Sequence, residues 1–408
     1  MSPALIRLTV ALLLGPLLAG CAETPETPTE RYGFLALLGN DTISIESVTR
    51  YPDRFVSEEV DRFPEVKRRH TEVRLAPDGS PRHMDMRVHI PSAEPGSRDR
   101  RIVAEFDRDN VEVSLTDGTG TLTREEATDG MLALPHVPQM YSLLELYFAA
   151  ALERARAESL PAGGKVNARQ FYPDREFSNY PVPMHRGYVI PGGDGTAEIQ
   201  HYWLAGTGRA ELDSSRRMLA YSGARSTYKV EVTRLTEPPD VEAIGARFAA
   251  TEQAQGAPRS LSVRDTLRAT IGTANFTVDY GRPLVRGRTL VGDVIPYDHV
   301  WRTGANAATQ FSTSAPITLG GIPLPAGTYT LWTLPRRDGV SLIVNRQTGQ
   351  WGTGYGPGHD IGRTPLAAAA PAQPVEKFTI SIEPVNARSG ILALEWGPFR
   401  WTAPIRVE

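Results

Sequence analysis

The stretch that decides the fold is residues 65–90, EVKRRHTEVRLAPDGSPRHMDMRVHI. Apolar and polar side chains alternate on both sides of residues 77–80, PDGS, which have the composition of a tight turn. In the second half, Met84, Met86 and Val88 share one face, because successive side chains of a strand point to opposite faces. The stretch therefore predicts two antiparallel strands with one buried and one solvated face.

The same alternation extends outward, through residues 41–52 on one side and 101–123 on the other, and it resumes after residue 164. One helix is expected at 137–158, where apolar residues recur at near-helical spacing and Pro138 fits the first turn. Residues 32–235 are therefore expected to form an antiparallel curved sheet or half-barrel, with that helix packed on its concave side. At the level of the fold alone, such a sheet resembles the half-barrel periplasmic carriers of lipids and lipoproteins.

The remaining chain divides at residues 236–260, which begin near two prolines, contain a short helical pattern and end in Gly-Ala-Pro. This composition is typical of a linker between domains. From 261 to 408, short strand patterns alternate with strong glycine and proline turns, which predicts a β-sandwich or jelly-roll domain. The whole chain is thus expected to be all-β and mainly antiparallel.

The first 20 residues combine one positive charge, at Arg7, with an apolar run that Pro16 interrupts, a pattern typical of a signal peptide. Residues 18–21, Leu-Ala-Gly-Cys, resemble the lipobox of bacterial lipoproteins, and Cys21 is the single cysteine of the chain. The resemblance implies that Cys21 carries lipid and becomes the new N-terminus. The alternative is a secretory signal cut near Ala19.

Residues 21–31 are acidic and rich in proline and threonine, as expected of a solvated tether. Ala22, rather than aspartate, follows the cysteine. By resemblance to proteobacterial sorting rules, this implies a lipid-anchored protein on the periplasmic face of the outer membrane.

Several function classes find no support in the sequence. The chain has 408 residues with 44 Lys and Arg against 47 Asp and Glu, and no basic stripe, which argues against nucleic acid as a partner. There is no P-loop, no dinucleotide motif and no strand–helix–strand pattern to hold one. His83, Asp85 and His89 share a strand face, but Arg87 between them opposes a cation, so neither a metal nor a cofactor is expected. No nucleophile motif is present.

The candidate site surrounds residues 296–311, PYDHVWRTGANAATQF, where a strand-like aromatic segment runs into a turn. Guanidinium groups suit carboxylate or phosphate ligands, because each offers two parallel donors. The candidate ligand-binding residues are the arginines of this region with nearby polar and aromatic side chains: Tyr280, Arg282, Arg286, Arg288, His299, Arg302 and Asn306. The alternative is architectural: Arg302 pairs with Asp279 or Glu395, and Asn306 caps the turn.

Several motifs here, namely 279–283 DYGRP, 300–306 VWRTGAN, 324–329 LPAGTY and 349–353 GQWGT, resemble a bacterial family called domain of unknown function 2911. The resemblance covers residues 261–408, roughly, and implies no particular activity. In that family a glutamate often follows the asparagine, and this chain has Ala307 at that position.

Together these features predict a membrane-anchored periplasmic lipoprotein with a non-enzymatic role, either ligand binding or cell-envelope assembly. Its partners would be the membrane, through Cys21, and an anionic, glycan or lipid ligand. That ligand would lie at the arginine patch or in an apolar groove of the first domain. The alternative is a hydrolase acting on an envelope glycan or ester, with catalytic residues that the sequence does not identify.

Overall fold

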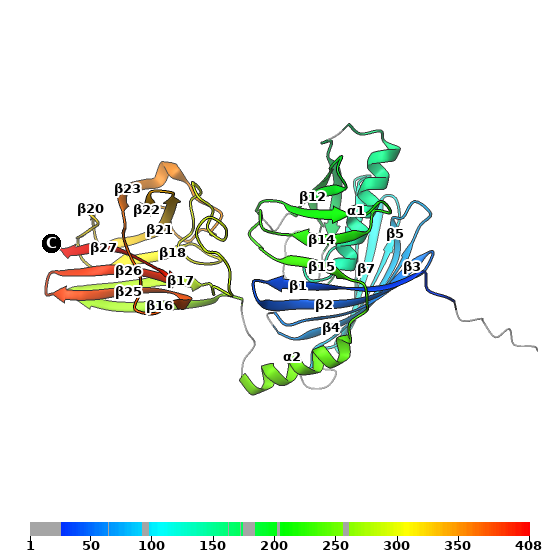
Figure 1. The fold of residues 1–408 in the computed structure, drawn as a ribbon, viewed down its shortest axis with the longest axis horizontal. Coiled ribbons are helices and arrows are strands. Elements are labelled where there is room, and N and C mark those ends of the chain that lie inside the picture. The colour runs from blue at the N-terminus through cyan, green and yellow to red at the C-terminus, as the bar shows by residue number, and fades with distance from the viewer. Residues whose placement is uncertain are drawn as a thin grey trace, which may run out of the picture.

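The computed structural model describes residues 26–63, 65–91, 98–161, 163–171, 173, 184–201, 205–255 and 261–408. Cys21 and the expected signal peptide lie outside the described residues. The fold is mainly β and antiparallel, as predicted, with one large sheet followed by two smaller ones (Figure 1). We call residues 30–255 the first module and residues 263–407 the second module.

The first module is built on a 15-stranded sheet with the order β8-β7-β6-β5-β4-β3-β2-β1-β15-β14-β13-β12-β11-β10-β9. Its strands are β1 (Glu30–Leu38), β2 (Asp41–Arg50), β3 (Arg54–Asp61), β4 (Lys67–Leu75), β5 (Pro81–His89), β6 (Arg100–Phe106), β7 (Asn110–Asp117), β8 (Gly120–Ala127), β9 (Leu132–Pro135), β10 (Val166–Phe171), β11 (Met184–Pro191), β12 (Thr196–Gln200), β13 (Gly208–Leu212), β14 (Met218–Ser222) and β15 (Glu231–Leu235). The stretch at 65–90 supplies β4 and β5, paired antiparallel as predicted.

The sheet curves round helix α1 (Tyr141–Ala157), whose buried face fills the concave side (Figure 1). Leu143, Tyr147 and Phe148 of the helix are buried in one core with Met84 and Met86 of β5. Sequence alternation therefore sets the inner face: most residues facing α1 are apolar, with a few buried charged side chains among them, and their neighbours on each strand face outward.

The expectation that no strand–helix–strand unit exists is wrong. Strands β9 and β10 pair in parallel on either side of α1, so β9, α1 and β10 form such a unit. Strand β9 has four residues, LALP, too few for a period-two pattern to be read from sequence. No phosphate-binding motif accompanies it in the sequence.

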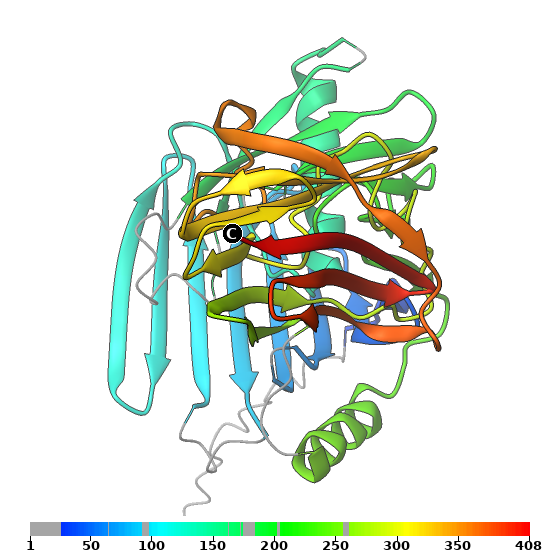
Figure 2. The ribbon, with the colours of Figure 1, turned by 90° about the vertical axis from the view of Figure 1, so that its left-hand side faces the viewer.

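Helix α2 (Val241–Gln255) packs on the outer face of the first sheet, opposite α1. Val241 joins a small apolar cluster with Ile45, Val60 and Val66. The helix covers β2 and β3 and leaves the outer face of the strands that follow them in the sheet uncovered. Figure 2 shows these later strands, in cyan, side by side in one broad sheet.

The second module is a sandwich of two six-stranded sheets that share one core. One has the order β16-β17-β18-β21-β22-β23, and the other β20-β19-β27-β26-β25 with β24 beside β27. The strands are β16 (Val263–Ile271), β17 (Ala274–Arg282), β18 (Thr309–Thr313), β19 (Ile317–Leu319), β20 (Ile322–Leu324), β21 (Gly327–Arg336), β22 (Gly339–Asn345), β23 (Asp360–Pro365), β24 (Ala367–Ala369), β25 (Val375–Asn386), β26 (Ser389–Gly397) and β27 (Phe399–Val407), with a 3-10 turn at Pro357–His359.

The two modules meet where the β1–β2 turn touches the loop after β17. Arg286 donates through Nε to Asp41 Oδ2 at 2.7 Å, and its carbonyl accepts from the Asn40 amide at 2.9 Å. Gly39 makes this approach possible: it has φ +60°, and a Cβ there would lie 2.1 Å from the Arg286 carbonyl oxygen. Arg286, grouped with the candidate ligand-binding residues on sequence grounds, therefore joins the two modules.

Candidate functional site

Two of the candidate residues hold the sandwich together. Tyr280 is buried, and its hydroxyl accepts from the Ile380 amide at 3.1 Å. Arg282 uses its guanidinium as a three-way clamp, donating to Asp265 Oδ2 (2.7 Å), the Phe378 carbonyl (2.9 Å) and Thr379 Oγ1 (2.7 Å). With its donors engaged in this way, Arg282 links β16, β17 and β25.

Arg288 and His299 make local contacts with the backbone. Arg288 donates to the carbonyls of Val285 (3.1 Å) and Leu284 (2.7 Å), which closes the loop after β17. His299 is exposed, and its Nδ1 lies 2.8 Å from the Tyr297 carbonyl oxygen, to which Nδ1–H donates. The hydrogen bond of His299 is therefore to the backbone and not to another candidate residue.

Arg302 differs from the other candidate arginines. Within the part of the chain that the structure describes, its guanidinium makes one hydrogen bond, from Nη1 to the Asn306 carbonyl at 3.5 Å, a long and weak contact. The expected alternative partners are taken by other residues: Asp279 pairs with Arg264 at 2.9 Å and Glu395 with Arg400 at 2.7 Å. The expected ion pair of Arg302 with Asp279 or Glu395 is therefore wrong. Its guanidinium keeps N–H donors that are available for another acceptor.

The environment of Arg302 is partly buried. Burial lowers the pKa of Arg302 below its ordinary value, although a guanidinium remains charged at neutral pH. The chain passes very close to it at Gly352, where a Cβ would lie 2.1 Å from Arg302 Cδ. A partly buried positive charge with one weak acceptor gains most from a negatively charged partner.

The turn that carries Arg302 has an unusual backbone. Thr303 and Asn306 both adopt left-handed conformations, with φ of 50° and 62°. For a β-branched residue such as Thr303 this costs about 1–3 kcal/mol. The Thr303 carbonyl accepts from Thr309 Oγ1 at 2.6 Å, and the Asn306 carbonyl accepts from the Gly352 amide at 3.0 Å, which hold the turn in place. The Asn306 side chain is exposed and forms no cap with the turn.

A residue of the first module completes the cluster. Lys229 lies between β14 and β15, and its ammonium donates to the Ala224 carbonyl. Burial is the largest cause of its lowered pKa; Asp293 and Glu231 oppose the shift, and the positive charges of Arg288 and Arg302 add to it. Burial, followed by Arg286, also lowers the pKa of Arg288. Lys229 of the first module is therefore within electrostatic reach of Arg288 and Arg302 of the second module, and also of the Asp293 carboxylate.

An exposed aromatic ring lies beside this cluster. Trp351 keeps 58% of its surface exposed and forms a bridge with Ala307, next to Asn306. We call Lys229, Arg288, Arg302, Asn306 and Trp351 the junction site. Sequence reasoning missed Lys229, which no local pattern connects to Arg288 and Arg302, 59 and 73 positions later. It also missed Trp351, although an aromatic residue between glycines in GQWGT is a visible signal.

Other parts of the molecule offer less. The cavity between α1 and the inner sheet face, lined by residues that include His136, His201 and Tyr228, measures about 10 Å³. Within the described ranges no three metal-binding side chains gather, and the three residues weighed as ligands each have another neighbour: Glu105 for His83, Arg101 for Asp85 and Asp99 for His89. In the same ranges no helix has the length and apolar character needed to cross a bilayer.

The molecule is thus a two-module, mainly antiparallel β protein whose second module is a sandwich. Residues 262–405 match the family described as "Protein of unknown function (DUF2911)", so the second module is a DUF2911 domain. None of the curated proteins compared with the chain matches it.

Two solved structures are similar at a low level. A DUF1089 family protein from Pseudomonas aeruginosa has 14% identity and a TM-score of 0.33, over 46% of this chain and 93% of that chain. A beta-barrel-like protein of domain of unknown function DUF1849 from Brucella abortus has 10% identity and a TM-score of 0.32, over 52% of this chain and 96% of that chain.

Proposed function

We propose that this protein is a lipid-anchored, non-enzymatic binding protein of the cell envelope, and that it holds an anionic ligand at the junction site. The observation that carries the proposal is the guanidinium of Arg302, partly buried and satisfied only by one backbone carbonyl at 3.5 Å. Lys229 and Arg288 add two further positive charges, which the Asp293 carboxylate offsets in part. A carboxylate or phosphate would complete the hydrogen bonding of Arg302.

The site also supports a preference for a ligand with a ring. The exposed indole of Trp351 offers a flat apolar face, and the Trp351 backbone forms a β-bridge with Ala307, the residue after Asn306. Aromatic faces pack against the apolar faces of rings, while guanidinium forks fix an acidic group. A sugar or similar small ring that carries an acidic group fits both features.

The binding test compares a neutral sugar with its phosphate. We expect glucose 6-phosphate to bind the full chain more tightly than glucose, as measured by isothermal titration calorimetry. Arg302→Gln should weaken glucose 6-phosphate at least about tenfold, because one charge-assisted contact is worth about 1.5–3 kcal/mol. Lys229→Gln should act in the same direction.

The matched control is Arg388→Gln, in the exposed turn between β25 and β26 and away from the junction site. It removes the same charge from the same module and should leave affinity unchanged. If the wild-type chain and the Arg302→Gln variant bind glucose 6-phosphate with equal affinity, the junction site is not where the anion binds.

The anchor rests on a separate feature, the Leu-Ala-Gly-Cys sequence that ends at Cys21. Several acyl-type chains on one residue hold a protein stably on a membrane, whereas a single chain is marginal. We expect intact-mass spectrometry of the membrane-purified protein to show a chain that starts at Cys21 and carries added acyl mass. Cys21→Ser should abolish the added mass and release the protein from the membrane fraction. A wild-type chain without acyl mass would exclude the anchor.

A further inference from the structure

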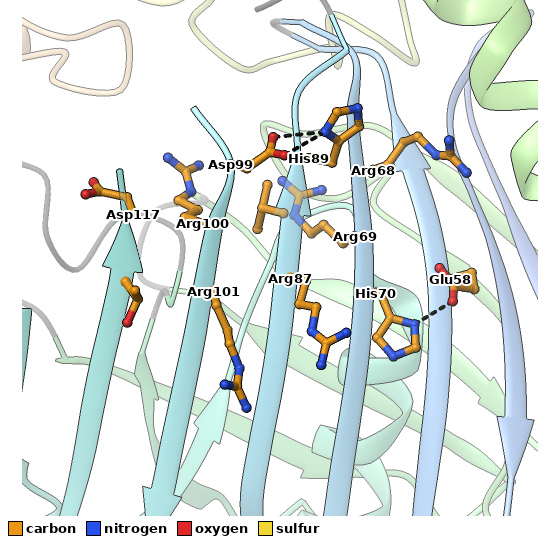
Figure 3. Close-up of a pocket in the computed structure, with 12 residues that line it drawn as sticks. Glu58, Arg68, Arg69, His70, Arg87, His89, Asp99, Arg100, Arg101 and Asp117 are labelled. Atoms are coloured by element: carbon orange, nitrogen blue, oxygen red, sulfur yellow. Dashed lines mark hydrogen bonds and ion pairs between the residues drawn. The ribbon is translucent and has the colours of Figure 1, made fainter. Parts of the chain in front are cut away.

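The outer face of the first sheet carries an open groove that the junction site does not include. It measures about 580 Å³ and lies across β3 to β7, on the face opposite α1 (Figure 3). Of the twelve described residues that line it, Val88 alone is apolar, and its side chain is buried. The groove is therefore a charged surface, bordered by α2 through a 3.6 Å contact between Arg68 and Glu242.

Strand register places its basic side chains in two rows. Arg68 lies opposite His89, and two residues along the same strands His70 lies opposite Arg87, which in turn faces Arg101. Figure 3 shows Arg101, Arg87 and His70 side by side across three neighbouring strands. Such a grid has spacings of about 4.8 Å between strands and about 6.8 Å along them.

Carboxylates on the same face pair with part of this grid: Glu58 lies 2.5 Å from His70, and Asp99 lies 2.9 Å from His89. Arg101 donates two hydrogen bonds to the Asp85 carboxylate, at 2.9 and 2.7 Å. Arg87 approaches the same carboxylate only to 4.0 Å, and its side chain is 66% exposed. Like charges directly opposite each other on a sheet are destabilising. Arg68 and Arg87, each with a single long ion pair, therefore have donors available for an external anion.

The other end of the same outer face has the opposite charge. Glu105, Glu112 and Glu125 lie in one row across β6, β7 and β8. An extended anion is repelled from that row, so it would lie across the strands, along the cationic rows, and not along the strands. Several spaced cations favour a ligand with several spaced negative charges over a single small ion.

We infer that this groove binds a segment of anionic polysaccharide that carries sulfate or phosphate esters. Its volume is in the range of pockets that hold small organic ligands, and its donors are guanidinium forks. A membrane surface fits less well, because the lining offers no exposed apolar side chain to enter a bilayer. A single-stranded nucleic acid fits less well, because the described lining residues include no phenylalanine, tyrosine or tryptophan on which bases could stack.

The test uses the full-length protein and a sulfated dextran oligosaccharide, with unsulfated dextran as the neutral comparison. We expect the sulfated oligosaccharide alone to bind, more weakly as salt rises. Arg68→Gln combined with Arg87→Gln should weaken binding at least about tenfold. The matched control is Arg74→Gln on β4, on the same face but paired with Glu72 at 2.9 Å, which should leave affinity unchanged. Glu112→Gln should increase affinity.

Four outcomes would overturn the inference. One is the absence of binding, and another is an equal loss with Arg74→Gln. The third is loss of dextran sulfate binding with Arg302→Gln but not with the groove variants, which would move the ligand to the junction site. The fourth is binding to anionic phosphatidylglycerol vesicles that the double variant abolishes while dextran sulfate does not bind, which would assign the groove to a membrane. Because Arg302→Gln leaves the groove intact, failure here and failure of the junction site are distinguishable.

Discussion

Replacing Arg69 by methionine is expected to lower the free energy of unfolding by about 3–5 kcal/mol, because it leaves two buried carboxylates without their shared cation. Arg69 on β4 donates to Glu59 at 2.8 Å and to Asp61 at 2.5 Å, and the three side chains are each at most 2% exposed. They lie on the inner face of the sheet, next to the buried polar pair Ser57 and Thr71. Urea unfolding of the variant and the wild-type chain measures the difference.

The loss of unfolding free energy in the Arg69→Met variant should increase as the pH rises. Burial raises the pKa of Glu59 well above its ordinary value of 4.5, and Arg69 opposes the shift. A carboxyl group whose folded pKa is raised makes the fold less stable as pH rises above the unfolded value, because the unfolded chain releases its proton first. Without Arg69 the folded pKa is higher still, so the variant should lose more stability at pH 7.5 than at pH 5.

The matched control is Arg68→Met, one residue earlier. Arg68 points to the outer face, is 34% exposed and has only a 3.6 Å contact with Glu242. Its loss should change stability by less than about 0.5 kcal/mol. Adding Glu59→Gln and Asp61→Asn to the Arg69 variant should restore much of the loss, because neutral amides need no counter-charge. If Arg68→Met and Arg69→Met cost the same, burial of the Arg69 cluster is not the cause.

Replacing Glu145 by alanine is expected to cost about 3–5 kcal/mol for a related reason. Glu145 lies on the buried face of α1 and is the common acceptor of four groups: Tyr32 Oη (2.6 Å), Arg50 Nη2 (2.7 Å), Arg234 Nη1 (2.7 Å) and the Met218 amide (2.9 Å). Without Glu145, two arginines lose their shared carboxylate. Helix α1 also loses hydrogen bonds that connect it to β1, β2, β14 and β15.

Thermal and urea unfolding of the Glu145→Ala variant test this expectation, with Glu158→Gln as control. Glu158, at the end of the same helix, pairs with Arg154 at 2.7 Å on an exposed surface. Exposed pairs of this kind contribute about 0.3–0.5 kcal/mol, so Glu158→Gln should change the free energy of unfolding by no more than that. A small loss in Glu145→Ala would mean that the two arginines find other partners, such as Glu30, which already lies 2.7 Å from Arg234.

The sequence predicts the elements with strong local periodicity. The alternation around Met84 and Met86 indicates both strands and the buried face, and the apolar spacing near 137–158 indicates α1. The helix begins at Tyr141, later than expected, and the sandwich has more strands than its local patterns show, because β19, β20 and β24 have three residues each. Strands that short carry too little pattern to be recognised.

The sequence does not predict partners that are distant along the chain. Arg282 and Arg302 look alike in local context, yet one is a clamp between strands and the other has spare donors. The difference depends on which carboxylates and carbonyls the fold brings near, and Phe378 lies 96 positions from Arg282. Lys229 interacts electrostatically with Arg288 and Arg302, which belong to the other module and lie 59 and 73 positions later.

The start of α1 has a consequence for how the chain folds. Met140, at the N-cap, supplies no side-chain bond, and the amides of Tyr141 and Ser142 donate instead to the Glu46 carboxylate at 2.8 and 2.9 Å. That acceptor lies on β2, 95 positions earlier. Helix nucleation is costly, so residues 141–157 gain their final stability only once β2 is in place. During synthesis β2 leaves the ribosome first, which gives the helix a template as it emerges.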